Sequence, residues 1–437
     1  MNPETLGIVA ILALTIVIFT GFPIAFILLF MGIIFGYIGF GDTVFNLLTL
    51  QFFSTMRDTT LAAVPLFVFM GLLLEKANMV DRLFKIFQLL LGRVKGSLYI
   101  AVLFTATIFA AATGIVGASV TLLGVMAGKV MIKSGYDVKL SAGAITAGGT
   151  LGILIPPSVM LVVMGPVMGV PVTELFTAAI IPGIMLALIY TVYCLTRSFI
   201  NPKLGPPLPE YELQISTNEL VREIVLGVLP VAAIIFFTLG TIMAGICTPT
   251  DAAAMGAFGS LMLTVISRRL SWKNFKMSVF HTVEITTMIM FLIACSNFFG
   301  AVFSRLGTAN MISNTLLSLN LPSGVLLAIS LLIIFILGWP LEWVPIVVIY
   351  LPILSPIIQQ CGWNVTWFCI LVAVCLQTAW LSPPVALSAY FLKGVVPEWD
   401  LKEIYLGMMQ FMVLQLIGLL LIALFPNIAL WLPAILK

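Results

Sequence analysis

The first long apolar run of the chain, from Leu6 to Phe40, contains no charged residue. It is broken by the turn signal Gly21-Phe22-Pro23, and it is long enough for two short transmembrane spans. Similar runs recur along all 437 residues, so that apolar residues make up 61% of the chain and charged residues only 8%. A soluble domain carries about 25% charged residues. The composition therefore excludes a soluble enzyme and a nucleic-acid-binding protein, and it predicts a polytopic helical protein in a lipid bilayer.

The apolar segments form two halves that follow the same plan. Each half contains an apolar segment interrupted near its middle by Gly or Pro, and then a second segment that is interrupted in the same way. The first kind of segment predicts a re-entrant helical hairpin, at about 97–132 and about 321–358. The second kind predicts a broken helix, at about 139–170 and about 364–395.

Landmarks in the two halves match at one offset. Gly135-Tyr136-Asp137 corresponds to Gly362-Trp363-Asn364, and Pro156-Pro157 corresponds to Pro383-Pro384, both with a shift of 227 residues. An internal repeat of this length is typical of secondary transporters. We therefore predict a first repeat, a cytoplasmic linker and a second repeat, at 1–199, 200–222 and 223–437.

The positive charges predict the orientation of these repeats. If the hairpins enter and leave on one side, each half has an odd number of full crossings, and the two halves are inverted. With the N-terminus outside, all 20 lysines and arginines except Arg57, Arg305 and Lys437 fall in segments that are inside. This distribution follows the positive-inside rule. The predicted fold is an all-α polytopic membrane protein with two inverted repeats, about ten full crossings and two re-entrant hairpins.

The four predicted breaks suggest where ligands bind. A break in the middle of a membrane exposes backbone groups that lipid cannot satisfy, so it persists only where it lines a site. The C-terminal ends of half-helices are partly negative and suit Na⁺, whereas their N-terminal ends are partly positive and suit an anion. Few ionisable residues lie inside the spans, which favours Na⁺ coupling over a proton relay.

The candidate site residues follow from these breaks. The first Na⁺ site is predicted to comprise Thr113, Gly114, Gly117, Thr150 and Gly152. The second Na⁺ site is predicted to comprise Gly338, Pro340, Thr378, Leu381 and Ser382. The substrate anion is expected between the hairpin tips, near Thr113, Pro156, Pro157, Ser158, Pro383 and Pro384. Glu342, beside the second tip, is interpreted as a helix-start acid, with a role as a ligand as the alternative.

At these residues the chain resembles the large membrane subunit of tripartite ATP-independent periplasmic (TRAP) transporters. The most specific similarities are in Gly135–Asp137, Thr150–Ser158, Thr248–Ala254, Ile336–Gly338, and Leu381–Pro384 followed by Leu392–Val395. The first tip departs from the family: it reads Thr113-Gly114-Ile115 where many members have Ser-Gly-Ser. The second tip carries Glu342 where members often have Asp.

The resemblance implies several further properties. These are a scaffold domain and a moving transport domain in an elevator mechanism, Na⁺ coupling, and location in the bacterial inner membrane, where the charge distribution puts both termini in the periplasm. It also implies a small four-helix membrane subunit and a soluble periplasmic substrate-binding protein as partners. The expected substrate is a small organic anion, a carboxylate or a sulfonate.

Two alternative functions place different demands on the chain. One is an ion-coupled dicarboxylate or citrate carrier of elevator type that works without partner proteins. The other is a membrane-embedded enzyme, which requires a catalytic set of side chains around one cavity. The chain has a single histidine, His281, and its six cysteines are scattered. We therefore expect a transporter and not an enzyme.

Overall fold

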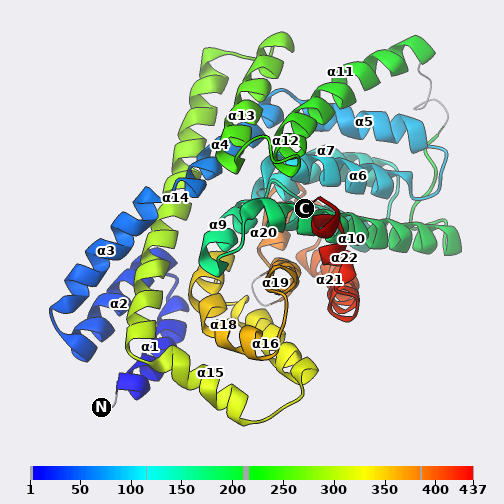
Figure 1. Cartoon of the computed structure of the whole chain (residues 1–437). Helices are drawn as coiled ribbons and strands as arrows, with labels where there is room; N and C mark the ends of the chain where they lie inside the picture. The colour runs from blue at the N-terminus through cyan, green and yellow to red at the C-terminus, as the bar shows by residue number, and fades with distance from the viewer. Residues whose placement is uncertain (1–2, 115, 210–215, 384–385, 437) are drawn as a thin grey trace.

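The computed structural model describes residues 3–114, 116–209, 216–383 and 386–436, and only the backbone of residues 111–113 and 217. In these ranges every regular element is a helix (Figure 1). The first half contains α1 (Pro3–Ile18), α2 (Ile24–Phe40), α3 (Thr43–Arg57), η1 (Thr60–Ala62), α4 (Ala63–Lys76), α5 (Met79–Leu91), α6 (Ser97–Thr113), α7 (Val116–Lys133), α8 (Val138–Leu154), α9 (Val159–Met168) and α10 (Val172–Ile200).

The second half repeats this order of elements. It contains α11 (Thr217–Ile235), the π-helical turn η3 (Phe236–Gly240), α12 (Thr241–Met243), α13 (Pro249–Ile266), α14 (Trp272–Arg305), α15 (Thr308–Ser318), α16 (Ser323–Leu337), α17 (Trp343–Pro345), the π-helical turn η4 (Ile346–Tyr350), α18 (Leu351–Gln360), α19 (Val365–Ala379), α20 (Leu387–Val395), α21 (Leu401–Leu424) and α22 (Asn427–Leu436). The predicted hairpins are α6–α7 and α16–α18, and the predicted broken helices are α8–α9 and α19–α20.

Matching residues start the two broken helices. The backbone N–H of Leu140 donates to the Asp137 carboxylate over 2.8 Å, and the N–H of Trp367 donates to the Asn364 side-chain oxygen over 3.0 Å. Asp and Asn are preferred N-cap residues because they satisfy a backbone donor that the first helical turn leaves free. The landmark found in the sequence at a shift of 227 residues is therefore a pair of equivalent helix caps.

Eight helices in the described part are long and apolar enough to cross a membrane, or up to nine if the bent pair of α3 and α4 counts as one span. This confirms the prediction of an all-α polytopic membrane protein. Two of the eight, Val116–Lys133 and Trp343–Gln360, belong to the predicted hairpins, so the predicted ten crossings also require α1, α2 and α19, which are apolar but shorter.

Three helices of ten or more residues were not predicted from the sequence, α3, α15 and α22. The polar residues Asn46, Gln51 and Ser54 weaken the apolar signal of α3. After α3 the chain bends by 58° before it continues as α4. The N–H of Thr60 donates to the Asp58 carboxylate over 2.9 Å at this bend. The equivalent element of the second half is the single long helix α14.

The linker between the halves is shorter than predicted and is tied to the first half. Helix α10 ends at Ile200 and α11 begins at Thr217, so the last residues of the predicted linker are helical. The N–H of Gly96 donates to the Gly205 carbonyl oxygen, and the N–H of Leu208 donates to that of Gly92, both over 2.9 Å. The N–H of Asp137 donates to the Leu204 carbonyl over 3.1 Å. These bonds join the linker to the loops that precede α6 and α8.

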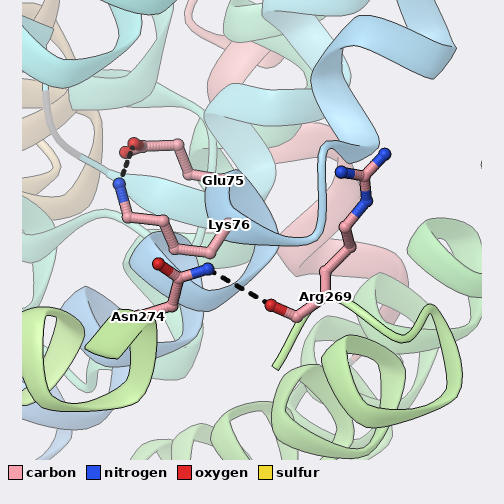
Figure 2. Close-up of polar contacts among 4 residues, drawn as sticks. All are labelled: Glu75, Lys76, Arg269 and Asn274. Atoms are coloured by element: carbon pink, nitrogen blue, oxygen red, sulfur yellow. Dashed lines mark hydrogen bonds and ion pairs between the residues drawn. The ribbon is translucent and has the colours of Figure 1, made fainter. Parts of the chain in front are cut away.

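A polar corner lies where α4 ends and α14 begins (Figure 2). The Lys76 ammonium contacts the Glu75 carboxylate over 2.9 Å, and the Asn274 side chain donates to the Arg269 carbonyl over 3.2 Å. A pocket of about 240 Å³ at this corner is also lined by Asp81 of α5. The corner thus joins two of the segments that the positive charges predict to lie on the inner side of the membrane.

The two broken helices form the centre of the core. Every residue of α8 from Leu140 to Leu154 is buried, and so is every residue of α19 from Thr366 to Thr378. Helices α10 and α21 pack against both of them. In Figure 1, α1, α2, α3 and α14 lie together on one side, and α9, α18, α19 and α20 lie between them and the group of α5, α6, α7 and α10.

Candidate functional site

The first break separates α8 from α9 at Pro156-Pro157. Proline has no N–H to donate and its ring clashes with the preceding turn, so two prolines in succession end the helix. The peptide bond between them is cis. The hydroxyl of Ser158 donates to the carbonyl oxygen of Ile153, in the last turn of α8. The predicted residues Pro156, Pro157 and Ser158 are all buried at this break.

The tip of the first hairpin lies directly against this break. Gly114 ends α6 with a φ of +63°, in the left-handed region that favours glycine. A Cβ atom added to Gly114 would lie 3.0 Å from the carbonyl oxygen of Pro157 and 3.5 Å from the backbone nitrogen of Val159. The first hairpin tip and the first break therefore lie side by side.

The second break separates α19 from α20. The last turn of α19 tightens, because the N–H of Trp380 donates to the Gln377 carbonyl over 3.2 Å and that of Leu381 donates to the Thr378 carbonyl over 3.0 Å. The chain then passes through Ser382 and Pro383, and Ala386 precedes α20 with a φ of +35°. Leu381 and Ser382 are buried, whereas Pro383 is exposed.

The tip of the second hairpin lies against this second break. A Cβ atom added to Gly338 would lie 3.0 Å from the Cβ atom of Ala379. The indole N–H of Trp339 donates to the hydroxyl oxygen of Ser382 over 3.0 Å. Each half of the molecule therefore places its hairpin tip on its own broken helix.

Two of the threonines predicted as Na⁺ ligands, Thr150 and Thr378, keep free acceptor capacity. The buried hydroxyl of Thr150 donates to the Ala147 carbonyl over 2.8 Å, and that of Thr378 donates to the Cys375 carbonyl over 2.5 Å. A hydroxyl that donates its proton still has lone pairs to offer a cation. Gly152 is buried in the last turn of α8.

Some predicted residues are not part of this arrangement or lie outside the description. An added Cβ atom on Gly117 would lie 3.0 Å from the Phe391 ring, so Gly117 faces α20 and not the first break. The side chain of Thr113 and the whole of Pro384 lie outside the described residues.

A polar chain that the sequence did not reveal joins the two broken helices. The side-chain amide of Gln377 donates to the carbonyl oxygen of Thr150 over 3.2 Å, and its oxygen accepts a hydrogen bond of 2.5 Å from Gln415. All three residues are fully buried. The positions of Thr150 and Gln377 differ by the repeat offset of 227. That spacing was visible in the sequence, but the contact between equivalent positions was not.

A small pocket lies at the second hairpin tip, beside the second break. Its volume is about 170 Å³. The lining comes from the tip, the end of α19, the start of α20 and Ile24 of α2, and it comprises Gly338, Trp339, Pro340, Leu341, Glu342, Trp343, Leu376, Ala379, Trp380 and Leu387. Glu342 stands at the N-cap position of α17, as the helix-start interpretation predicts, but its side chain makes no capping hydrogen bond.

Comparison with protein families identifies related sequences over nearly the whole chain. A family described as "Tripartite ATP-independent periplasmic transporter, DctM component" matches residues 11–428. The C4-dicarboxylate TRAP transporter large permease protein DctM of Pseudomonas aeruginosa is 29% identical over 88% of this chain and 89% of its own length. The sialic acid TRAP transporter large permease protein SiaM of Vibrio cholerae is 29% identical over 95% and 96%. The ectoine TRAP transporter large permease protein TeaC of Halomonas elongata is 26% identical over 87% and 88%.

A solved structure shares the fold. The YdaH transporter of Alcanivorax borkumensis aligns with a TM-score of 0.63 over 99% of this chain and 98% of that one. Its sequence identity is 14%, so the similarity concerns the fold alone.

Proposed function

The chain belongs to the family of the DctM component of tripartite ATP-independent periplasmic transporters, and from this assignment we propose that it couples the import of a small organic anion to Na⁺ by an elevator mechanism. The family assignment makes the chain a multi-pass transporter of small organic acids, not an enzyme. It also implies a small membrane subunit and a periplasmic substrate-binding protein as partners. Na⁺ coupling, the moving domain and the orientation go beyond this assignment.

The proposal of Na⁺ coupling is supported above all by the two tip-and-break pairs. Gly114 lies against the Pro157 carbonyl, and Trp339 lies against the Ser382 hydroxyl, so each pair brings oxygen atoms of a break next to a hairpin tip. A hard cation needs several oxygen ligands at one point, and the C-terminal ends of α8 and α19 add partial negative charge. We assign one Na⁺ to each pair, with Thr150 in the first and Thr378 in the second.

The elevator mechanism is supported by the packing of the helices, which fall into two groups. Helix α14 packs on α2, α3 and α4, and α13 packs on α4. The hairpins and broken helices pack mainly among themselves and on α5, α10 and α21, with smaller contacts of the second hairpin on α14 and of α6 on α4. We propose that the first group is the scaffold and that the second moves across the membrane with the bound ligands.

The proposed substrate is a carboxylate or a sulfonate, and the proposed partners are a four-helix membrane subunit and a soluble periplasmic protein. The relatives are named as transporters of C4-dicarboxylates, sialic acid, isethionate and ectoine. We place the chain in a bacterial inner membrane with both termini periplasmic, because this orientation puts most positive charges inside.

The decisive experiment compares purified protein in matched NaCl and KCl. A ligand that binds only the folded state stabilises it by about 2.7 kcal/mol at roughly 100 times its dissociation constant. We expect Na⁺ to raise the thermal unfolding midpoint and Thr378→Ala to lose most of that rise. Thr191→Ala is the matched control, because the buried Thr191 hydroxyl also bonds within its own helix, to the Ala187 carbonyl over 2.7 Å.

Transport in proteoliposomes with the partner proteins completes this test. Uptake should require an inward Na⁺ gradient, and uptake that ignores the gradient would contradict the coupling. Full uptake without the small subunit and the binding protein would favour a carrier that works alone.

A further inference from the structure

The pocket at the second hairpin tip has an aromatic lining. Trp339 and Trp343 line it from the tip, and Trp380 lines it from the end of α19. These are three of the eight tryptophans of the chain. Its volume of about 170 Å³ is below the roughly 300–1,000 Å³ of ordinary small-molecule sites. The pocket therefore suits a compact group or one end of a ligand.

One carboxylate belongs to this pocket and has no cationic partner in the described part of the chain. Glu342 lines the pocket between Leu341 and Trp343, and its side chain does not cap α17. Neither lysine nor arginine is among the lining residues, and the ion pairs in the described ranges, Lys76–Glu75 and His281–Glu284, do not involve it. Glu342 is exposed, so a cation that enters the pocket can reach its carboxylate. The arrangement therefore suits a cation supplied from outside the chain.

The lining favours an organic ammonium group over a metal ion. Indole rings attract cations to their faces, and alkylated ammonium groups are the ligands that aromatic pockets commonly recognise. A hard metal ion instead needs several oxygen atoms around it, and the three indole rings supply none.

The pocket is also connected to the break where the substrate anion is expected. The indole N–H of Trp339 donates to the Ser382 hydroxyl over 3.0 Å, so one wall of the pocket is fixed to the second break. The Trp339 indole ring separates the pocket from the break, so a ligand with its anionic end at the break and its cationic end in the pocket must reach across this ring. Such a ligand must be short.

We propose that this pocket binds the ammonium end of a small zwitterionic carboxylate. Glu342 supplies the counter-charge, Trp339, Trp343 and Trp380 supply the aromatic walls, and the carboxylate of the substrate occupies the second break. The proposal rests on the proposed function, because it takes the break as the anion site. It narrows the substrate class from organic anions in general to carboxylates that carry an alkylated ammonium group.

The test uses the purified full-length chain at constant NaCl and follows its tryptophan fluorescence and unfolding midpoint. The probes are glycine betaine, choline, the uncharged choline isostere 3,3-dimethylbutan-1-ol, and succinate. We expect saturable responses to glycine betaine and, more weakly, to choline, and no response to the uncharged isostere. Because choline and its isostere differ in charge and hardly in shape, this comparison tests the pocket without any substitution.

Substitutions then locate the site. Glu342→Gln should weaken glycine betaine binding by about tenfold or more, which corresponds to about 1.4 kcal/mol. Trp343→Phe should weaken it less, since a smaller aromatic face remains. Glu284→Gln is the control, because Glu284 is an exposed acid on α14 that contacts His281 over 3.4 Å and does not line the pocket. It should leave binding unchanged.

Three outcomes would overturn the proposal. The first is an equal response to choline and to its uncharged isostere. The second is a Na⁺-dependent response to succinate without a response to glycine betaine. The third is a Glu342→Gln variant that loses the stabilisation by Na⁺ but still binds the ammonium probes. The second leaves the proposed function intact, and the third makes Glu342 an ion ligand. Failure of the proposed function is recognised separately, by an unfolding midpoint of the unsubstituted chain that is the same in NaCl and KCl.

Discussion

Gln377 donates a hydrogen bond of 3.2 Å to the backbone carbonyl oxygen of Thr150, and the two residues occupy equivalent positions of the two halves, 227 residues apart. The bond therefore joins the two broken helices near the point where their symmetry relates them. Gln415 extends it from α21 with a bond of 2.5 Å to the Gln377 oxygen. The last turns of α8 and α19, to which Thr150 and Thr378 belong, are thus held in a fixed relation.

Replacing Gln377 should weaken the fold. Gln377→Met leaves the Thr150 carbonyl and the Gln415 amide without this partner in a fully buried place, which we expect to cost about 1–3 kcal/mol. The unfolding midpoint of the purified protein measures the loss. Gln359→Met, at the exposed end of α18, is the control and should change little. Equal midpoints for both variants would show that the buried chain adds no stability.

Gly114→Ala should disturb the first tip by more than the cost of placing an alanine at a positive φ. An alanine with positive φ costs about 1–2 kcal/mol, and here its Cβ atom would also lie 3.0 Å from the Pro157 carbonyl oxygen. Gly135→Ala separates the two effects, because Gly135 has a φ of +71° and nothing within 4 Å of an added Cβ atom. We expect Gly114→Ala to reduce uptake in proteoliposomes and Gly135→Ala to preserve it. Similar uptake by the two variants would mean that the contact with the break is dispensable.

Gly407→Ala should be among the most damaging small substitutions. The added Cβ atom would lie 2.1 Å from the Lys139 carbonyl oxygen, so α21 would have to move away from the backbone of α8. Overpacking of this kind costs about 1–3 kcal/mol or more. Gly259→Ala in α13 meets only an ordinary contact of 3.5 Å. We expect it to be neutral or slightly stabilising, because alanine favours helix more than glycine. Yield and unfolding midpoint in detergent compare the pair.

Asp81→Asn should change how stability depends on pH. Burial raises the pKa of the Asp81 carboxyl above its ordinary value of 3.8. The folded state therefore binds this proton more tightly than the unfolded state, and stability falls as pH rises through the folded-state pKa. We expect Asp81→Asn to raise the unfolding midpoint at pH 7 and to lose this advantage near pH 3.5. A difference that is the same at both pH values would assign the effect to something other than ionisation.

The breaks could be predicted from the sequence because local chemistry determines them. Pro156-Pro157 lacks backbone donors, and glycine at position 114 permits the positive φ found there without a steric penalty. The caps Asp137 and Asn364 are local in the same way.

The contacts between helices could not be predicted, because they join segments that meet only in the folded chain. The Thr150–Gln377 bond, the close approach of Gly407 to Lys139 and the pocket around Glu342 each join residues of different helices. Hydropathy does not report such contacts, and it also missed α3, whose polar residues interrupt the apolar pattern.

The hydrogen bonds of the linker have a consequence for the order in which parts of the protein can fold during synthesis. Gly205 and Leu208 bond to Gly96 and Gly92, so both partners of each bond belong to the part of the chain that is synthesised first. The contact between Lys139 and Gly407, by contrast, requires nearly the complete chain. The first half can thus close this end of its structure while translation continues, but the side of α8 that packs on α21 stays uncovered until α21 is synthesised.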